Sequence, residues 1–73
     1  MFDYSALRGA MRAKNMTQEQ LAAKIGISST SLINKLKGTK PFFKADEILL
    51  IQKALELPSI EEYFFVLSDL RKS

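Results

Sequence analysis

Cysteine and histidine are both absent from the sequence. Without cysteine, no disulfide can stabilise the fold, and the lack of thiols favours a reducing cytoplasm. Without either residue, the chain has no ordinary zinc site, no thiol nucleophile and no imidazole base. We therefore expect a cytoplasmic protein that is not an enzyme and that uses no metal and no cofactor.

Glycine and long apolar runs are also scarce. The three glycines stand alone at positions 9, 26 and 38, so the sequence has no glycine-rich loop to cradle a phosphate. No apolar run approaches the roughly 20 residues that a membrane-spanning helix needs. The first 14 residues are amphipathic and unlike a secretory signal. We expect neither a membrane nor a small-molecule substrate among the partners.

The charged residues are unevenly distributed. The net charge is only +3, but residues 20–45 contain five lysines and no acidic residue. Residues 46–73 contain six acidic and three basic residues. A block of one sign is often only a solvated face, although it also fits a surface that binds nucleic acid.

The first half of the chain contains signals for three helices. Asp3 is expected to cap the first. Thr17-Gln18-Glu19-Gln20 is a capping box that begins the second, and Gly26 ends it in a left-handed conformation. Ser28 is expected to cap a third helix, which runs to about residue 37 and stops at Gly38.

The second half contains signals for two more helices. One has apolar residues at positions 48, 51 and 55 but a poor cap at Lys44. The other follows Pro58 and begins at a second capping box, Ser59-Ile60-Glu61-Glu62. No strand pattern is visible, and 73 residues indicate a single domain over residues 1–73. The predicted fold is all-α, a compact bundle of five short helices.

The second and third predicted helices should form a corner. Their turn is too short for an antiparallel pair, so they should cross at roughly 90–120°. The residues predicted to fill the core at this corner are Leu21, Ile25, Leu32 and Leu36. On a wheel of about 100° per residue, Thr30, Asn34 and Lys37 then point away from the core. Ile33 lies between the two sides, as a side contact or an exposed hydrophobe.

This arrangement resembles the helix-turn-helix of phage repressor and Cro-like proteins, the XRE-type family. The matching residues are Thr17-Gln18, Leu21-Ala22, Lys24-Ile25-Gly26-Ile27-Ser28, Ser31-Leu32 and Gly38. Because that family also has five short helices, the resemblance covers nearly the whole chain. It implies a lambda-repressor-like DNA-binding domain, with the helix-turn-helix at about residues 17–37. Met11 and Leu36 stand where many phage repressors have a buried Arg–Glu pair, and Lys35 stands where many relatives have an aliphatic residue. Together these departures look closer to small phage regulators of the Cro or modulator-of-repression type.

The resemblance implies a transcription regulator that binds double-stranded operator DNA through helix 28–37. The residues implied to contact bases are Ser29, Thr30, Ile33 and Asn34. The residues implied to contact phosphates are Thr17, Gln18, Lys35, Lys37 and Lys40. Simpler interpretations stay open, since polar residues cover the outside of any surface helix. Gln18 can be only a helix-start residue, and individual lysines can be solvated bystanders.

A protein-binding module on the same scaffold is the alternative function: an antirepressor, a modulator of repression or an antitoxin. Around the last predicted helix, the apolar side chains cover a wider arc than is needed for the side that faces the core. Tyr63, Phe65 and Leu70 are therefore candidates for a contact with a second copy of the chain or with another regulator. The other possibility is a helix that docks entirely into its own core.

Overall fold

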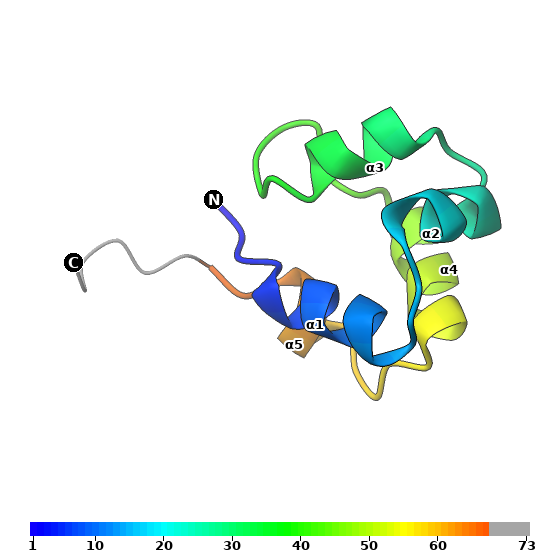
Figure 1. The fold of residues 1–73 in the computed structure, drawn as a ribbon. Helices are drawn as coiled ribbons and strands as arrows, with labels where there is room; N and C mark the ends of the chain where they lie inside the picture. Colours follow the sequence, from blue (N-terminus) through cyan, green and yellow to red (C-terminus); the bar gives the residue numbers. More distant parts are fainter. Residues whose placement is uncertain (68–73) are drawn as a thin grey trace.

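The architecture is all-α. The computed structural model describes residues 1–67, in which there are five helices and no strand. The helices are α1 (Ser5–Ala13), α2 (Gln18–Ile25), α3 (Ser29–Lys35), α4 (Ala45–Leu55) and α5 (Glu61–Phe64), as Figure 1 shows. None of these helices has the length and apolar character needed to cross a membrane. The predicted bundle of five short helices is confirmed.

The boundaries of α2 follow from the residues beside them. Thr17 Oγ1 accepts the N–H of Gln20 (3.1 Å), and the Gln20 side chain accepts the N–H of Thr17 (2.9 Å). These bonds satisfy two donors that a helix start leaves free. Gly26 ends α2 with φ of +80°, in the left-handed region that favours glycine. Ser28 then accepts the N–H of Ser31 and begins α3. The predicted capping box, left-handed stop and serine cap are confirmed.

Carboxylates stabilise the starts of α1 and α4. Asp3 accepts the N–H of Ser5 (2.9 Å), although Tyr4 occupies the capping position of α1. At α4 the cap residue is Lys44, whose ammonium cannot accept a hydrogen bond. The Glu47 carboxylate instead reaches back and accepts the N–H of Lys44 (2.9 Å). Both carboxylates therefore lie at the positive end of a helix dipole.

The predicted second capping box, Ser59-Ile60-Glu61-Glu62, is wrong. Ile60 has helical backbone angles (φ −90°, ψ −40°) and takes the capping position of α5, where no side chain caps the helix. Ser59 therefore lies one residue too early to cap it. The Ser59 hydroxyl is buried without a hydrogen-bond partner among the described residues. As a result α5 is a single turn of four residues.

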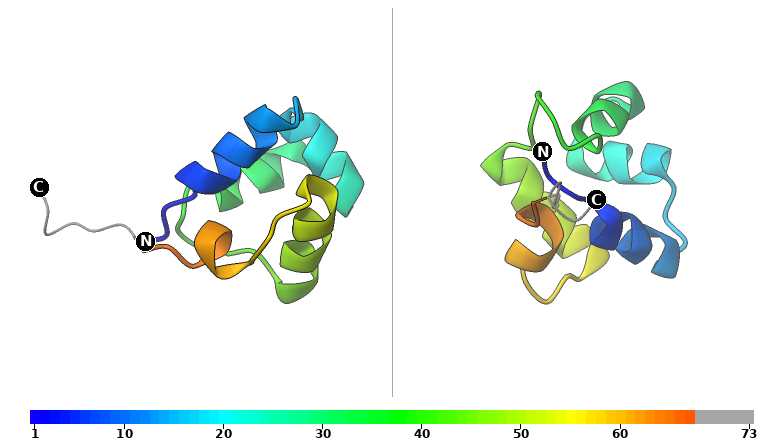
Figure 2. Two further views of the ribbon diagram at one scale, coloured as in Figure 1. Left: turned by 90° about the horizontal axis from the view of Figure 1, so that it is seen from below. Right: turned by 90° about the vertical axis from the view of Figure 1, so that its left-hand side faces the viewer.

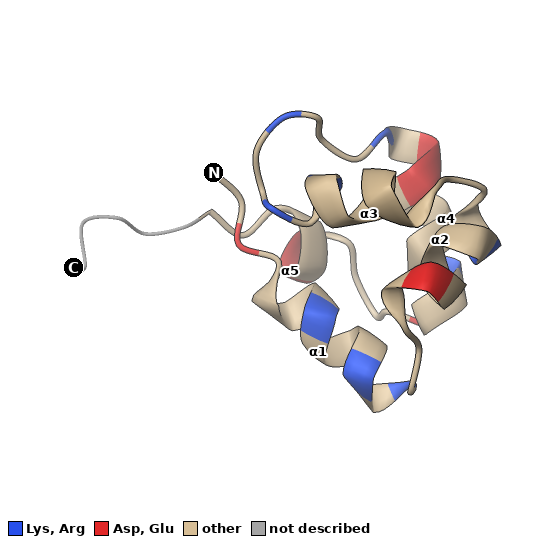
Figure 3. Cartoon of the chain, turned by 45° about the horizontal axis from the view of Figure 1, so that its top comes forward, with Lys and Arg blue, Asp and Glu red and all other residues tan. Residues whose placement is uncertain are grey.

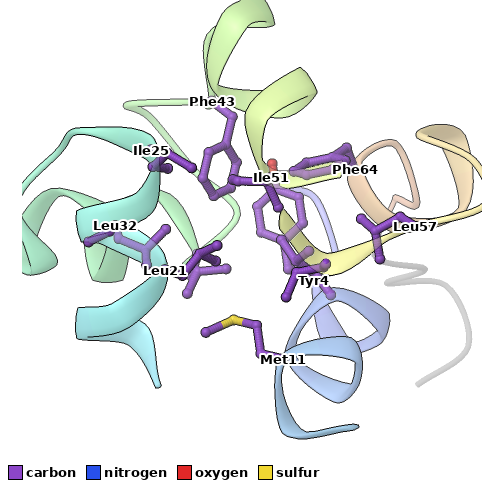
Figure 4. Close-up of a cluster of buried hydrophobic side chains, with 13 residues drawn as sticks. Tyr4, Met11, Leu21, Ile25, Leu32, Phe43, Ile51, Leu57 and Phe64 are labelled. Carbon is purple, nitrogen blue, oxygen red and sulfur yellow. The ribbon is translucent and has the colours of Figure 1, made fainter. Parts of the chain in front are cut away.

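One hydrophobic core lies between the helices, as Figure 4 shows. The core buries the four residues predicted to fill the corner, Leu21, Ile25, Leu32 and Leu36. It also buries Ile51 and Phe64, and Ile48 is partly buried. The Phe43 ring packs edge-to-face on Tyr4 (5.4 Å between centroids) and on Phe64 (5.5 Å). Complete burial of each large apolar side chain contributes roughly 1.5–3 kcal/mol, so these residues account for much of the stability.

The two ends of the described chain lie side by side, next to the residues that follow α3 (Figure 2). The N–H of Phe2 donates to the carbonyl oxygen of Gly38 (2.9 Å), and the N–H of Asp3 donates to that of Val66 (2.7 Å). Phe2 and Leu67 form an isolated antiparallel bridge. The N-terminal segment thereby connects the end of α3 to the segment after α5.

Candidate nucleic-acid interface

One side of α3 faces away from the core. Leu32 and Leu36 are completely buried, which turns the opposite side of this short helix outward. The outward side carries the four residues predicted to contact bases, Ser29, Thr30, Ile33 and Asn34. Two of them are exposed, and the other two, Ser29 and Asn34, are half-buried. Among residues 1–67, the side-chain hydrogen bonds of α3 and its cap use Ser28, Ser31 and Lys35. The hydroxyl of Thr30 and the amide of Asn34 are therefore available to another molecule.

An open hollow lies between α1 and the start of α2. Its volume is about 430 Å³, and its lining residues are Arg8, Met11, Arg12, Asn15, Met16, Thr17 and Gln18. The hollow brings the predicted phosphate contacts Thr17 and Gln18 together with Arg8 and Arg12, which were not among the predicted contacts. Their spacing was a usable signal, because Arg8 and Arg12 are four residues apart and so share one face of α1. With the N–H groups at the start of α2, they make the hollow suitable for an anion.

Arg8 also connects α1 to the end of α3. Its Nη2 donates to the carbonyl oxygen of Leu36 at 3.0 Å. Leu36 is the cap residue at the C-terminus of α3, where carbonyl groups lack partners within the helix and the dipole is negative. The bond fixes the hollow on α1 relative to the outward side of α3.

The prediction that Lys35 contacts a phosphate is wrong. Its side chain is only 9% exposed, and its Nζ lies 2.6 Å and 2.7 Å from the two carboxylate oxygens of Glu47. Burial by itself raises the pKa of the Glu47 carboxyl, but hydrogen bonds from Lys35 and from the Lys44 N–H, together with the charge of Lys35, hold that pKa below its ordinary value of 4.5. Lys35 follows Leu32 by three residues, so it lies on the inward side of α3 and not on the outward side.

The other two lysines predicted to contact phosphates remain accessible. Lys37 and Lys40 are both exposed, in the segment directly after α3. Figure 3 shows basic positions along α1 and after α3, whereas acidic positions mark the starts of α2, α4 and α5. Within residues 1–67, the only ion pairs are Lys14–Glu56 and Lys35–Glu47. The charges of Lys37 and Lys40 are therefore not neutralised by a pair in this part of the chain.

The predicted contact surface near the C-terminus is only partly described. Phe65 is 53% exposed, Tyr63 is half-buried against the core, and Leu70 lies outside the described residues. The Phe2 ring lies 6.0 Å from that of Phe65 and 5.6 Å from that of Phe42, between ring centroids. We call Phe2, Phe42 and Phe65 the terminal aromatic patch. Phe2 and Phe42 were not selected from the sequence, because the contact joins residues far apart in the chain.

Residues 1–66 match a family described as "Protein of unknown function (DUF739)", and the chain belongs to that family. No curated protein matches the sequence.

Proposed function

We propose that this member of the DUF739 family is a sequence-specific transcription regulator that binds double-stranded DNA with α3 in the major groove. The observation that carries the proposal is the outward side of α3, which presents an amide, hydroxyls and an aliphatic side chain while Leu32 and Leu36 hold the other side in the core. The major groove admits an α-helix and displays a distinct pattern of donors and acceptors for each base pair. The absence of thiols is consistent with action in the cytoplasm.

The outward residues of α3 have the chemistry to distinguish base pairs. The Asn34 amide can bind one adenine through two hydrogen bonds, in which its Nδ2 donates to N7 and its Oδ1 accepts from the N6 amino group. Ser29 and Thr30 can donate or accept a hydrogen bond with several bases. Ile33 is 43% exposed and offers an apolar contact for the methyl group of thymine. In this proposal these four residues supply the specificity.

Basic and polar residues around α3 would position the helix on the duplex. Gln18 and the start of α2 would contact one phosphate, beside Arg8 and Arg12 in the hollow. Lys37 and Lys40, in the segment that directly follows α3, would contact further phosphates. Thr17 can contribute its hydroxyl proton, because its oxygen already accepts the N–H of Gln20.

The proposal is tested by selecting bound fragments from a library of genomic duplexes and titrating the best fragment at several salt concentrations. We expect log K to fall linearly with log salt, with a slope of about −0.9 for each phosphate contacted. A scrambled duplex of the same length serves as the control and should bind far more weakly at physiological salt. Absence of duplex binding at low salt would contradict the proposal.

A protein-binding function is the second candidate, and the terminal aromatic patch favours it. Phe42 and Phe65 are 42% and 53% exposed, and aromatic residues are enriched at protein interfaces. An antirepressor, a modulator of repression or an antitoxin would use such a surface to bind another regulator. Tight capture of a repressor, together with no binding to any duplex at low salt, would select this function.

A further inference from the structure

The helix that carries the proposed base contacts is too short to be stable alone. α3 has seven residues, and isolated helices of fewer than about 12 residues are marginal in water. Its backbone lies close to that of α2, whereas it has few close backbone contacts with α4. Because α2 packs closely against both α3 and α4, it relates the two helices indirectly, and the direct link between them is made by side chains.

A buried ion pair makes that bridge. Lys35, the last residue of α3, places its Nζ 2.6 Å and 2.7 Å from the two carboxylate oxygens of Glu47 in the first turn of α4. Both side chains are more than nine-tenths buried. Glu47 is held in turn, because its Oε1 also accepts the N–H of Lys44. The ammonium of Lys35 therefore meets a carboxylate whose own position is fixed by the start of α4.

We propose that Lys35 and Glu47 are positioning residues that set the angle at which α3 presents Thr30 and Asn34 to DNA. The inference rests on the proposed function. Two bonds from one ammonium to one fixed carboxylate define a direction, whereas apolar contacts between α3 and α4 would be non-directional. Arg8 restrains the same end of α3 through the Leu36 carbonyl (3.0 Å), so polar bonds from α1 and α4 hold the helix from two sides.

The test replaces the pair by apolar residues, Lys35→Met with Glu47→Leu, in the full chain. Such a swap often preserves stability, because two desolvated charges are removed together. We expect the double variant to fold and to melt somewhat below the parent, because Glu47→Leu also removes the acceptor of the Lys44 N–H. It should discriminate less between the selected duplex and the same duplex with one changed base pair. The ratio of the two affinities should fall about tenfold, which is the order of discrimination that one base pair supplies.

The salt dependence separates positioning from phosphate contact. Lys35 is buried, so the double variant should keep the slope of log K against log salt, whereas Lys37→Met, an exposed lysine two residues further on, should reduce it by about one. A double variant that folds and keeps full discrimination would overturn the proposal. A slope reduced by one would also overturn it, because Lys35 would then contact phosphate directly.

A measurement without DNA keeps this test separate from that of the proposed function. We expect the double variant to lose nuclear Overhauser contacts between α3 and α4 and to shift the amide signal of Thr30, which lies five residues from the nearest substitution, with signals of α5 unchanged. An unchanged Thr30 signal would overturn the proposal whether or not the parent binds DNA. If the double variant fails to fold, Glu47→Gln, which keeps the side-chain shape but removes the charge, is compared with the parent by the same readouts.

Discussion

The carbonyl oxygen of Phe2 occupies the position where a side chain on Gly38 would begin. A Cβ added to Gly38 would overlap that oxygen and would lie 3.1 Å from the Phe2 carbonyl carbon and 3.3 Å from its nitrogen. The same backbone is held in place by the hydrogen bond from the Phe2 N–H to the Gly38 carbonyl (2.9 Å). Gly38 also has φ of +88°, so both the space and the backbone conformation require glycine.

We expect Gly38→Ala to destabilise the protein more than Gly26→Ala. At Gly26, φ is +80° but no atom lies within 4 Å of an added Cβ, so only backbone strain of about 1–2 kcal/mol is expected. At Gly38 the N-terminal segment must also move, so the free energy of unfolding should fall by roughly 2–4 kcal/mol in all. Urea denaturation of the two variants and the parent measures the difference. Equal losses of stability would show that the N-terminal segment does not hold its position against the end of α3.

Acid should destabilise the protein partly through Glu47. Its pKa is lowered in the folded state, so the ion pair with Lys35 contributes stability above the ordinary value of 4.5, and this contribution is lost as the pH falls through the lower, folded value. We expect the free energy of unfolding of the parent to fall with pH in this range by up to about 1.4 kcal/mol per pH unit for this group.

The matched control for the acid effect is the variant Lys35→Met with Glu47→Leu. Asp3 and Glu56, whose pKa values are also lowered by hydrogen bonds, are present in both proteins, so the difference between their curves isolates Glu47. Urea denaturation at a series of pH values between neutrality and pH 3 provides the curves. Parallel curves for the parent and the variant would mean that the pair does not contribute to acid sensitivity.

The features of the fold that could be predicted from the sequence depend on residues close together in the chain. Thr17 and Gln20 are three residues apart and bond to each other, and Gly26 ends α2 by its own backbone conformation. The failure at Ser59 is also local, because Ile60 adopts helical angles and moves the cap by one residue. No rule of composition distinguishes Ser59 from Ser28, which does cap its helix.

The candidate site could be predicted less completely, because part of it depends on tertiary contacts. A helical wheel predicts the outward side of α3 correctly, because the burial of Leu32 determines which side of the helix faces the core. The role of Lys35 could not be predicted, because its partner Glu47 comes from another helix. The bond from Arg8 to Leu36, 28 residues away, could not be predicted for the same reason, although the spacing of Arg8 and Arg12 does indicate a basic face on α1.

Phe65→Ala should weaken self-association if the terminal aromatic patch is a dimer contact. A regulator of a two-fold operator pairs its recognition helices roughly one helical turn of DNA apart, and the exposed ring of Phe65 is a candidate for the contact that pairs them. We expect the loss of this ring to cost about 1–3 kcal/mol of association free energy. Leu49→Ala is the control, because Leu49 is similarly exposed (57%) but lies on α4. Sedimentation equilibrium that shows an unchanged monomer for the parent and both variants would exclude this interface.

Asn34→Ala and Lys37→Met should impair DNA binding in different ways. Asn34 can form a bidentate contact with one adenine, so its loss should remove preference at one base pair, by about 1–3 kcal/mol, and leave other positions unchanged. Lys37 is exposed and directly follows α3, where we propose that it contacts a phosphate, so its loss should weaken binding to all duplexes alike and reduce the salt slope by about one. Titration of each variant against the selected duplex and a set of single-base-pair changes measures both effects.

The contrast between these two variants tests the orientation of α3 and not only its presence at the interface. If α3 lay across the phosphate backbone, both substitutions would reduce affinity for every duplex, and neither would change the preference at a single position. Ser31→Ala is the control within the helix, because Ser31 is half-buried and its Oγ bonds to that of Ser28 at 3.0 Å. Its loss should change neither the preference nor the salt slope. A relaxed preference with Ser31→Ala but not with Asn34→Ala would mean that a different side of α3 reads the bases.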